Sequence, residues 1–98
     1  MNISKIENER SLTLALAGRL DTTTAPQLEQ AVNESIDGIT ELIFDLEKLD
    51  YVSSAGLRVL LAAQKRMNKQ GSMTVKNICS DIMEVFQITG FTEILTIE

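Results

Sequence analysis

Two adjacent serines, Ser53 and Ser54, stand in the segment "DYVSSAGLRVLLAAQKRM" (residues 50–67), where an apolar run meets a helical pattern. A serine at such a boundary predicts a helix N-cap, whose hydroxyl accepts a hydrogen bond from a free backbone N–H and contributes about 1 kcal/mol. The same position also suits a phosphate, because the free N–H groups and macrodipole of a helix N-terminus favour an anion. A phosphate would add about −1.5 to −2 charges to the surface without unfolding the domain. On these residues alone the cap is the simpler interpretation, and a phosphorylation switch is the alternative.

A second group of polar side chains lies in the segment "GRLDTTTAP" (residues 18–26), where an aspartate is followed by three threonines. Asp and Thr side chains commonly accept hydrogen bonds from nearby backbone N–H groups in turns and at helix starts. We therefore expect Asp21 and Thr24 to shape this turn. A helix should begin just beyond it, with Thr24 or Ala25 as its N-cap and Pro26 in its first turn.

Three carboxylates, Asp45, Glu47 and Asp50, are expected in a loop at the end of a buried strand. Carboxylate oxygens are ligands that Mg²⁺ accepts in proteins. Nothing in the spacing of the three residues fixes a coordination geometry, so a solvated rim is the preferred interpretation. No metal and no cofactor are expected.

The chain contains no histidine, which excludes Ser-His and Cys-His nucleophilic catalysis and every zinc site that uses histidine. It also lacks the glycine-rich loop followed by Lys and Ser or Thr that phosphate-loop enzymes need. Cys79 is the only cysteine, so no internal disulfide can form, and a reducing, intracellular location is expected. We expect Cys79 itself to be a small buried hydrophobe.

Length and composition predict one domain, residues 1–98. Hydrophobic residues make up 44% of the chain and charged residues 23%, which is enough apolar material for a small core. The formal net charge of −5 disfavours binding to nucleic acid or to anionic membranes, because both need a surplus of positive charge. No segment has the length and apolarity of a signal peptide or a bilayer span, so a cytoplasmic protein is expected.

Alternating apolar residues predict a β-hairpin near the N-terminus. The segment "SLTLALAG" (residues 11–18) alternates leucines with small or polar residues, which is typical of a strand with one buried face, and Gly18 should end it. The preceding "NISKIE" alternates Ile3 and Ile6 and should be the partner strand, with the turn around "ENE". The segment "ELIFDL" (residues 41–46) is almost continuously apolar, so we expect a strand buried on both faces beneath helices.

Two helices are expected around this third strand. The first should run to Gly38, where a glycine stops it. The second should run from about Ala55 to Lys69, with Arg58 and Lys65 on its exposed face. Its buried face should consist of Gly56, Leu60, Ala63 and Met67.

A third helix should be capped by Ser80 or Asp81 and should end at Gly90, with Phe91 packing back against it. Its inward residues should be Ile82, Val85 and Phe86. Short strands in "GSMTVKNI" and "EILTI" precede and follow this helix. The resulting order β-β-α-β-α-β-α-β predicts an α/β domain with a small mixed β-sheet and helices packed on it.

Three segments, "GRLDTTTAPQLEQAV", "LIFDLEKLDYVSSAGLRVLLAAQKRM" and "VFQITGFTEILTI", resemble the STAS family, and within it the bacterial anti-sigma factor antagonists. The resemblance covers nearly the whole chain and implies a single STAS domain that regulates transcription by partner switching and is not an enzyme. In the family, the unphosphorylated antagonist binds an anti-sigma factor that is also a serine kinase, which releases a sigma factor to RNA polymerase. The kinase phosphorylates one serine of the antagonist with ATP and so breaks the complex, and a PP2C-type phosphatase restores it.

The resemblance also implies site residues. The phosphorylated serine of the family lies two residues ahead of a Gly-Leu pair, which places it at Ser54 here, and we expect Ser54 to cap the helix as well. Many members have an aspartate immediately before that serine, where this chain has Ser53, so Ser53 is the rival acceptor. Ala55 replaces a second serine, and Asp21 matches an acidic residue of the first loop that contributes to partner binding. The expected partner-binding residues are Asp21, Thr22, Ser53, Ala55, Gly56 and Arg58.

Two other functions stay open at this point. STAS domains also occur as subunits of bacterial lipid-transport complexes and in stress-signalling scaffolds, and such a subunit would bind its partner without a phosphorylation switch. The third hypothesis is an enzyme, either a serine hydrolase or a nucleotide hydrolase. The absence of histidine and of a phosphate loop argues against it.

Overall fold

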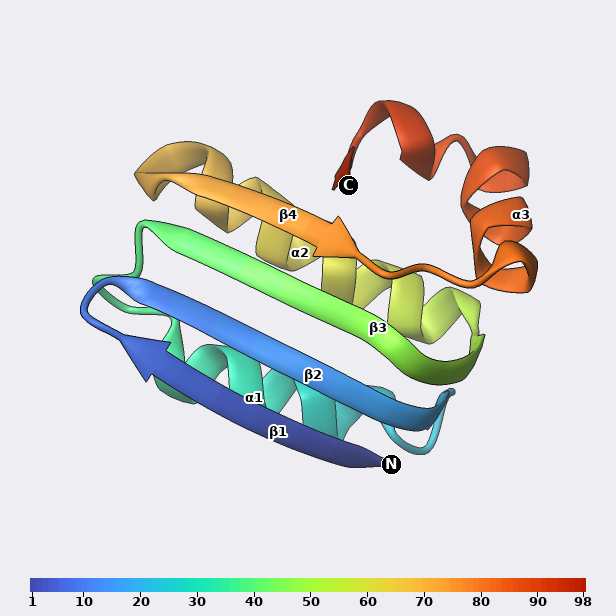
Figure 1. The fold of residues 1–98 in the computed structure, drawn as a ribbon, viewed down its shortest axis with the longest axis horizontal. Helices are drawn as coiled ribbons and strands as arrows, with labels where there is room; N and C mark the ends of the chain where they lie inside the picture. Colours follow the sequence, from blue (N-terminus) through green and yellow to red (C-terminus); the bar gives the residue numbers. More distant parts are fainter.

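A β-hairpin opens the chain, and helices and strands then alternate to its end in the computed structural model, which describes residues 1–98 (Figure 1). This order is the one that the sequence predicts. The elements are β1 (Asn2–Asn8), β2 (Ser11–Leu20), α1 (Ala25–Ser35), β3 (Glu41–Val52), α2 (Ser54–Gln70), β4 (Ser72–Lys76), α3 (Ser80–Thr89), a 3₁₀ helix (Phe91–Glu93) and β5 (Thr96–Ile97).

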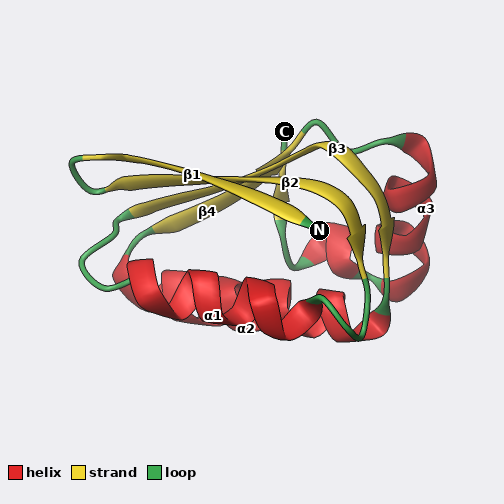
Figure 2. Ribbon diagram, turned by 90° about the horizontal axis from the view of Figure 1, so that it is seen from below, coloured by secondary structure: helices red, strands yellow, loops and turns green.

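The five strands form one mixed sheet in the order β1-β2-β3-β4-β5. β1 pairs antiparallel with β2, and every later pair is parallel. Helices α1 and α2 lie side by side across one face of the sheet, while α3 lies beyond the end of the strands (Figure 2). The expected α/β architecture with a mixed sheet is therefore confirmed.

Most of the core lies between the sheet and helices α1 and α2, and Ile82 and Phe86 of α3 join the same buried cluster. Leu12, Leu14 and Leu16 of β2 are fully buried, or nearly so, and their intervening neighbours are only half-buried, as the alternation predicts. The residues of α2 that were expected to face inward are buried as well, whereas Arg58 and Lys65 are exposed. Burial of one face per element thus follows directly from the hydrophobic pattern.

The prediction that the third strand is buried on both faces is wrong. Along β3, Leu42, Phe44 and Leu46 are fully buried, but Ile43 is only half-buried. Successive parallel strands lie in chain order, and crossovers between parallel strands are right-handed, so α1 and α2 fall on the same face. The opposite face of the sheet carries no helix layer (Figure 2).

Both long strands extend further than the sequence predicts. β2 continues past Gly18 to Leu20, because Gly18 adopts a left-handed φ of +103° at a register shift and pairing resumes beyond it. β3 reaches Val52, so the three carboxylates lie within a strand and not in a loop after it. The two strands therefore bring their carboxyl ends together close to the paired serines.

Helix ends account for most of the remaining differences. α1 ends at Ser35, three residues before Gly38, with Ile36 as its C-cap. α3 has Cys79 as its N-cap and no side-chain cap, so the prediction of Ser80 or Asp81 as the capping residue is wrong. Cys79 is exposed rather than buried, because it lies at the start of α3, beyond the ends of the strands.

The end of α3 follows the prediction. Gly90 is left-handed, with φ of +80°, and the rings of Phe86 and Phe91 lie 6.4 Å apart between centroids. The last strand is shorter than expected, because the 3₁₀ helix takes up Phe91–Glu93 and leaves only Thr96–Ile97 paired with β4. None of the helices is both long and apolar enough to cross a membrane.

Candidate functional site

The carboxyl ends of β2 and β3 hold the two polar segments side by side (Figure 1). Leu20 is the register partner of Val52, and the backbone N–H of Ser53 donates to the carbonyl of Leu20 at 2.8 Å. Because these strands are parallel, α1 and α2 both begin at this edge of the sheet. The loop of Asp21 and the serine pair are therefore neighbours, as the STAS resemblance implies.

Ser53, and not Ser54, is the N-cap of α2. Ser53 has extended dihedral angles (φ −97°, ψ 173°), and its hydroxyl accepts from the backbone N–H of Gly56 at 3.3 Å. The prediction that Ser54 caps the helix is wrong, because the N-cap role requires a residue that is not yet helical. Ser54 is already the first helical residue.

The two serines consequently differ in availability. Ser53 is half-buried and its hydroxyl is engaged in the cap. Ser54 is exposed, and its hydroxyl takes part in no hydrogen bond within the protein. A reagent or enzyme that approaches the start of α2 therefore meets a free hydroxyl at Ser54 and an occupied one at Ser53.

Gly56 allows the first turn of α2 to lie directly against β2. A Cβ atom at this position would lie 2.5 Å from Cγ of Leu20 and 3.2 Å from its carbonyl oxygen. Leu20 is fully buried and has little room to move. Gly56 itself is buried, so it presents nothing to the surface and instead positions the exposed residues around it.

The Asp21 loop is held by its own hydrogen bonds. The carboxylate Oδ1 of Asp21 accepts from the Thr23 hydroxyl at 2.7 Å, from the Thr23 N–H at 3.0 Å and from the Thr24 N–H at 3.1 Å. The bond from the Thr23 hydroxyl is the largest influence; together with the backbone bonds it outweighs partial desolvation and lowers the pKa of the Asp21 carboxyl below its ordinary value. The expected role of Asp21 in shaping the turn is confirmed.

Thr24 is the N-cap residue of α1, which settles the choice left open between Thr24 and Ala25. Its hydroxyl does not cap the helix by a side-chain bond. It accepts from the backbone N–H of Asp21 and donates to the carbonyl of Arg19, each at 2.8 Å. Thr24 therefore ties the loop back to the end of β2, and the exposed Thr22 stands at the loop's tip.

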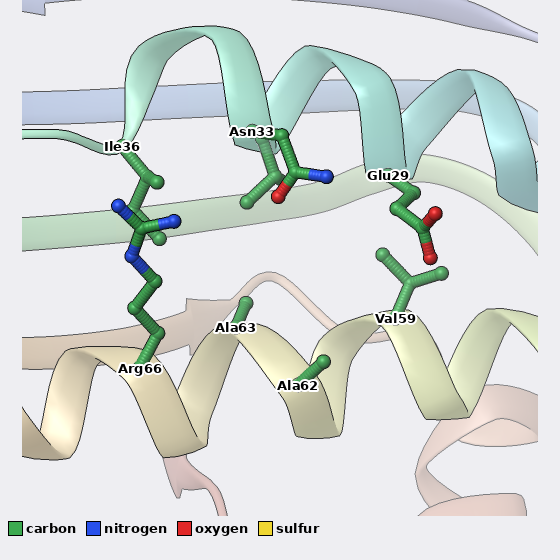
Figure 3. A pocket seen from close by; sticks show the side chains of 8 residues that line it. Glu29, Asn33, Ile36, Val59, Ala62, Ala63 and Arg66 are labelled. Carbon is green, nitrogen blue, oxygen red and sulfur yellow. The ribbon is translucent and has the colours of Figure 1, made fainter.

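A shallow groove runs along the seam between α1 and α2 from this site. At the site end its walls are formed by Thr22, Ala25, Pro26 and Glu29 on one side and by Ala55, Arg58, Val59 and Ala62 on the other. Glu29 points from α1 toward Val59, and further along the seam Arg66 reaches from α2 toward Ile36 of α1 (Figure 3). Arg66 also pairs with Asp37. The groove thus opens toward the serine pair and is bridged by an ion pair at its far end.

The STAS domain profile matches residues 2–98. The chain belongs to the STAS family. BtrV of Bordetella bronchiseptica, named as a candidate anti-sigma factor antagonist, is 33% identical over 99% of this chain and 85% of its own length. The anti-sigma-B factor antagonist of Bacillus subtilis is 29% identical over 99% of this chain and 90% of its own length.

Solved structures show the same fold. The anti-sigma factor antagonist SpoIIAA in its unphosphorylated form matches with a TM-score of 0.78 at 18% identity, over 99% of this chain and 87% of that one. SpoIIAA from Bacillus in its phosphorylated form also gives 0.78, at 19% identity, over 99% of this chain and 91% of that one. The STAS fold of this chain therefore resembles both forms of that protein to the same extent.

In this STAS domain the three carboxylates of β3 do not gather into one group, and no cluster of three or more Cys, Asp or Glu side chains is arranged to hold a metal ion. Oδ1 of Asp45 accepts from the side-chain amide of Asn77 at 3.0 Å and from the N–H of Glu47 at 3.1 Å. These bonds, that from Asn77 first, lower the pKa of Asp45. The hydrogen bonds of Asp45 thus stabilise the backbone of β3 at the point where it shifts register against β2.

Arg19 and Tyr51 also belong to the edge of the STAS site, and sequence reasoning missed them. The Arg19 guanidinium lies 4.2 Å from the centroid of the Tyr51 ring and 3.9 Å from a carboxylate oxygen of Asp21. The two residues are register partners in strands that were expected to end earlier. Extending both strands in their initial register would have paired Arg19 with Leu49, because two register shifts move its partner to Tyr51.

Proposed function

We propose that this STAS protein is a cytoplasmic anti-sigma factor antagonist whose partner binding is controlled by phosphorylation of Ser54. The observation that carries the proposal is the free, exposed hydroxyl of Ser54 at the first residue of α2, beside a neighbour that already provides the cap. The names of the curated relatives support the role of antagonist. The same relationship makes the protein a binding partner and not a catalyst.

The partner is an anti-sigma factor that is also a serine kinase. In the switching step, Oγ of Ser54 attacks the γ-phosphorus of ATP, the bond from that phosphorus to the bridging oxygen of ADP breaks, and the hydroxyl proton passes to a base of the kinase. A PP2C-type phosphatase reverses the modification: water attacks the phosphorus, inorganic phosphate leaves and the Ser54 hydroxyl is restored. Binding of the unphosphorylated form occupies the anti-sigma factor and releases a sigma factor.

The position of Ser54 makes it a better acceptor than Ser53. A phosphate on Ser53 would disrupt the hydrogen bond to the Gly56 N–H as it exists in the unmodified protein. A phosphate on Ser54 would extend from an exposed first-turn residue, where the helix dipole favours negative charge. We therefore expect modification to change the surface while the fold stays intact.

The partner surface surrounds this serine. Thr22 and Arg58 are exposed and Asp21, Ser53 and Ala55 half-buried, while the buried Gly56 positions them. The groove between α1 and α2 extends the surface away from the serine. A new charge of about −2 at the end of the groove nearest Ser54 would weaken binding of the partner through desolvation and charge repulsion.

The test is the intact mass of the protein purified from its native cells, with peptide mapping across residues 50–58. We expect one added phosphoryl group on Ser54 that a PP2C-type phosphatase removes and that is absent from Ser54→Ala protein. Ser53→Ala is the matched control and should still be modified. A phosphate on Ser53 instead would move the switch by one residue.

Absence of phosphate under every growth condition would contradict the switch and favour a STAS binding subunit without one. A pull-down from the same cells then separates the partners. Recovery of a soluble kinase supports the proposed antagonist, whereas recovery of a membrane-bound transport complex supports the alternative.

A further inference from the structure

Arg58 is the one arginine at this site that has no partner. Arg19 lies over Tyr51 and near Asp21, and Arg66 pairs with Asp37. Arg58 takes part in no ion pair or side-chain hydrogen bond, although it is exposed and lines the groove that opens beside Ser54. This unpaired guanidinium is therefore available to a phosphate on the neighbouring Ser54.

The helix places Arg58 over Ser54. The two residues are four apart within α2, so their side chains lie on the same face, one turn apart. Long side chains in helices lean toward the helix N-terminus, which directs Arg58 back across the turn that begins with Ser54. A guanidinium so placed is within reach of a phosphate carried by that serine.

Competing acids near Arg58 are few. Glu29 lines the opposite wall of the groove but forms no ion pair, and Asp21 is held by the threonines of its loop and by Arg19. A phosphoserine carries a larger charge than either carboxylate, and its three oxygens accept the planar guanidinium in a bidentate pair. Arg58 should therefore prefer the phosphate to Glu29.

We propose that Arg58 senses the phosphorylation state of Ser54: its guanidinium pairs with the phosphate and is thereby withdrawn from the partner surface. The inference rests on the proposed modification of Ser54. Phosphorylation would then make two changes at once, adding an anion and removing a cation that had been available to an acidic side chain of the anti-sigma factor. Both changes weaken the same complex.

The pairing is tested without any kinase. Phosphoserine is incorporated at position 54 during translation in the otherwise native chain, in Arg58→Gln and in Lys65→Gln, and the phosphate is titrated by ³¹P NMR. Lys65 is the matched control because it is exposed on the same helix, eleven residues from Ser54 or about 16 Å along the axis. Exposure of both positions means that neither substitution should alter folding, which thermal unfolding checks.

We expect the second pKa of the phosphoserine, ordinarily about 6, to be lower with Arg58 present than in Arg58→Gln, because a nearby cation favours the dianion. Lys65→Gln should match the parent, and the difference should shrink at high salt. Equal titration of the parent and Arg58→Gln would overturn the pairing. An equal shift in Lys65→Gln would overturn it too, because it would show only the general field of the protein.

Withdrawal from the partner is tested by affinity for the anti-sigma factor. In protein with Ser54→Ala, which stays unphosphorylated, adding Arg58→Gln should weaken the complex about threefold to tenfold, while Lys65→Gln should not. No weakening would overturn this half of the proposal. Failure to find phosphate in native cells would instead remove the proposed function, and the ³¹P result would still stand or fall independently.

Discussion

The two helices that begin at the site start in different ways. At the start of α1, Asp21, Thr23 and Thr24 satisfy one another and the adjoining backbone. At the start of α2, Ser53 alone makes the cap and leaves Ser54 free. The comparison shows how similar polar residues at neighbouring helix starts divide into a hydrogen-bonded frame and a free hydroxyl. Hydrogen bonds already made within the protein, and not residue type, decide which is which.

The largest effect is expected from a negative charge placed at Ser54, the serine whose hydroxyl is free. Ser54→Asp should weaken binding to the anti-sigma factor at least about 100-fold through uncompensated charge at the interface. Its thermal unfolding should change little, because an acidic residue suits the first turn of a helix. Calorimetric titration measures the affinity, with Ser54→Ala as a control that retains it. Tight binding by the Ser54→Asp protein would contradict the proposed switch.

The next largest effect concerns the contact that fixes the first turn of α2 against β2. Gly56→Ala should lower the free energy of unfolding by about 1 to 2 kcal/mol, since overpacking against Leu20 exceeds the gain in helix propensity. Urea denaturation measures the loss. Adding Leu20→Ala should relieve the crowding, so that the double variant is more stable than the sum of the two single effects predicts. Strict additivity would show that the close approach is not the cause.

Truncation of each serine in turn tests the division of roles directly. Ser53→Ala should reduce the free energy of unfolding by about 1 kcal/mol through loss of the cap. Ser54→Ala should change it by no more than about 0.5 kcal/mol. The same denaturation experiment compares both variants. A larger loss of stability for Ser54→Ala than for Ser53→Ala would show that Ser54, and not Ser53, caps the helix.

The smallest effect is expected in the rigid loop before α1. Because the pKa of Asp21 is lowered in the folded protein, this residue stabilises the fold at pH values above its unfolded pKa of about 3.9. The contribution is lost as the pH falls through the folded pKa. Asp21→Asn keeps an acceptor oxygen but does not titrate there, so stability should depend less on pH below about pH 4. Carboxyl ¹³C NMR of Asp21 checks the direction, and a pKa at or above the ordinary value would contradict it.

Much of this architecture could be predicted because it depends on local patterns. The alternation of leucines in β2, the apolar stripe of α2 and the glycine at position 90 each determine structure within a few residues. The neighbourhood of Asp21 and Ser54 followed from the family resemblance and is confirmed by adjacent strand ends. These features need no knowledge of which distant residues meet.

The rest depends on contacts between segments far apart in the chain. The choice between Ser53 and Ser54 as cap depends on where β3 stops pairing with β2, and that register includes two irregularities. The contact of Gly56 with Leu20, and of Arg19 with Tyr51, requires the same register. The open face of the sheet depends on strand order, which a hydrophobic run alone does not encode.

The close packing of α2 on β2 at Gly56 limits how far the effect of a phosphate on Ser54 would extend through the protein. Because the first turn of α2 packs closely against Leu20, we expect α2 not to tilt or slide when Ser54 carries the proposed phosphate. We then expect the proposed phosphate to act electrostatically, over a range set by screening of about 8 Å at physiological ionic strength. A partner that responds to the proposed phosphate would therefore have to contact the start of α2 itself, and a partner bound elsewhere on the protein would not respond to it.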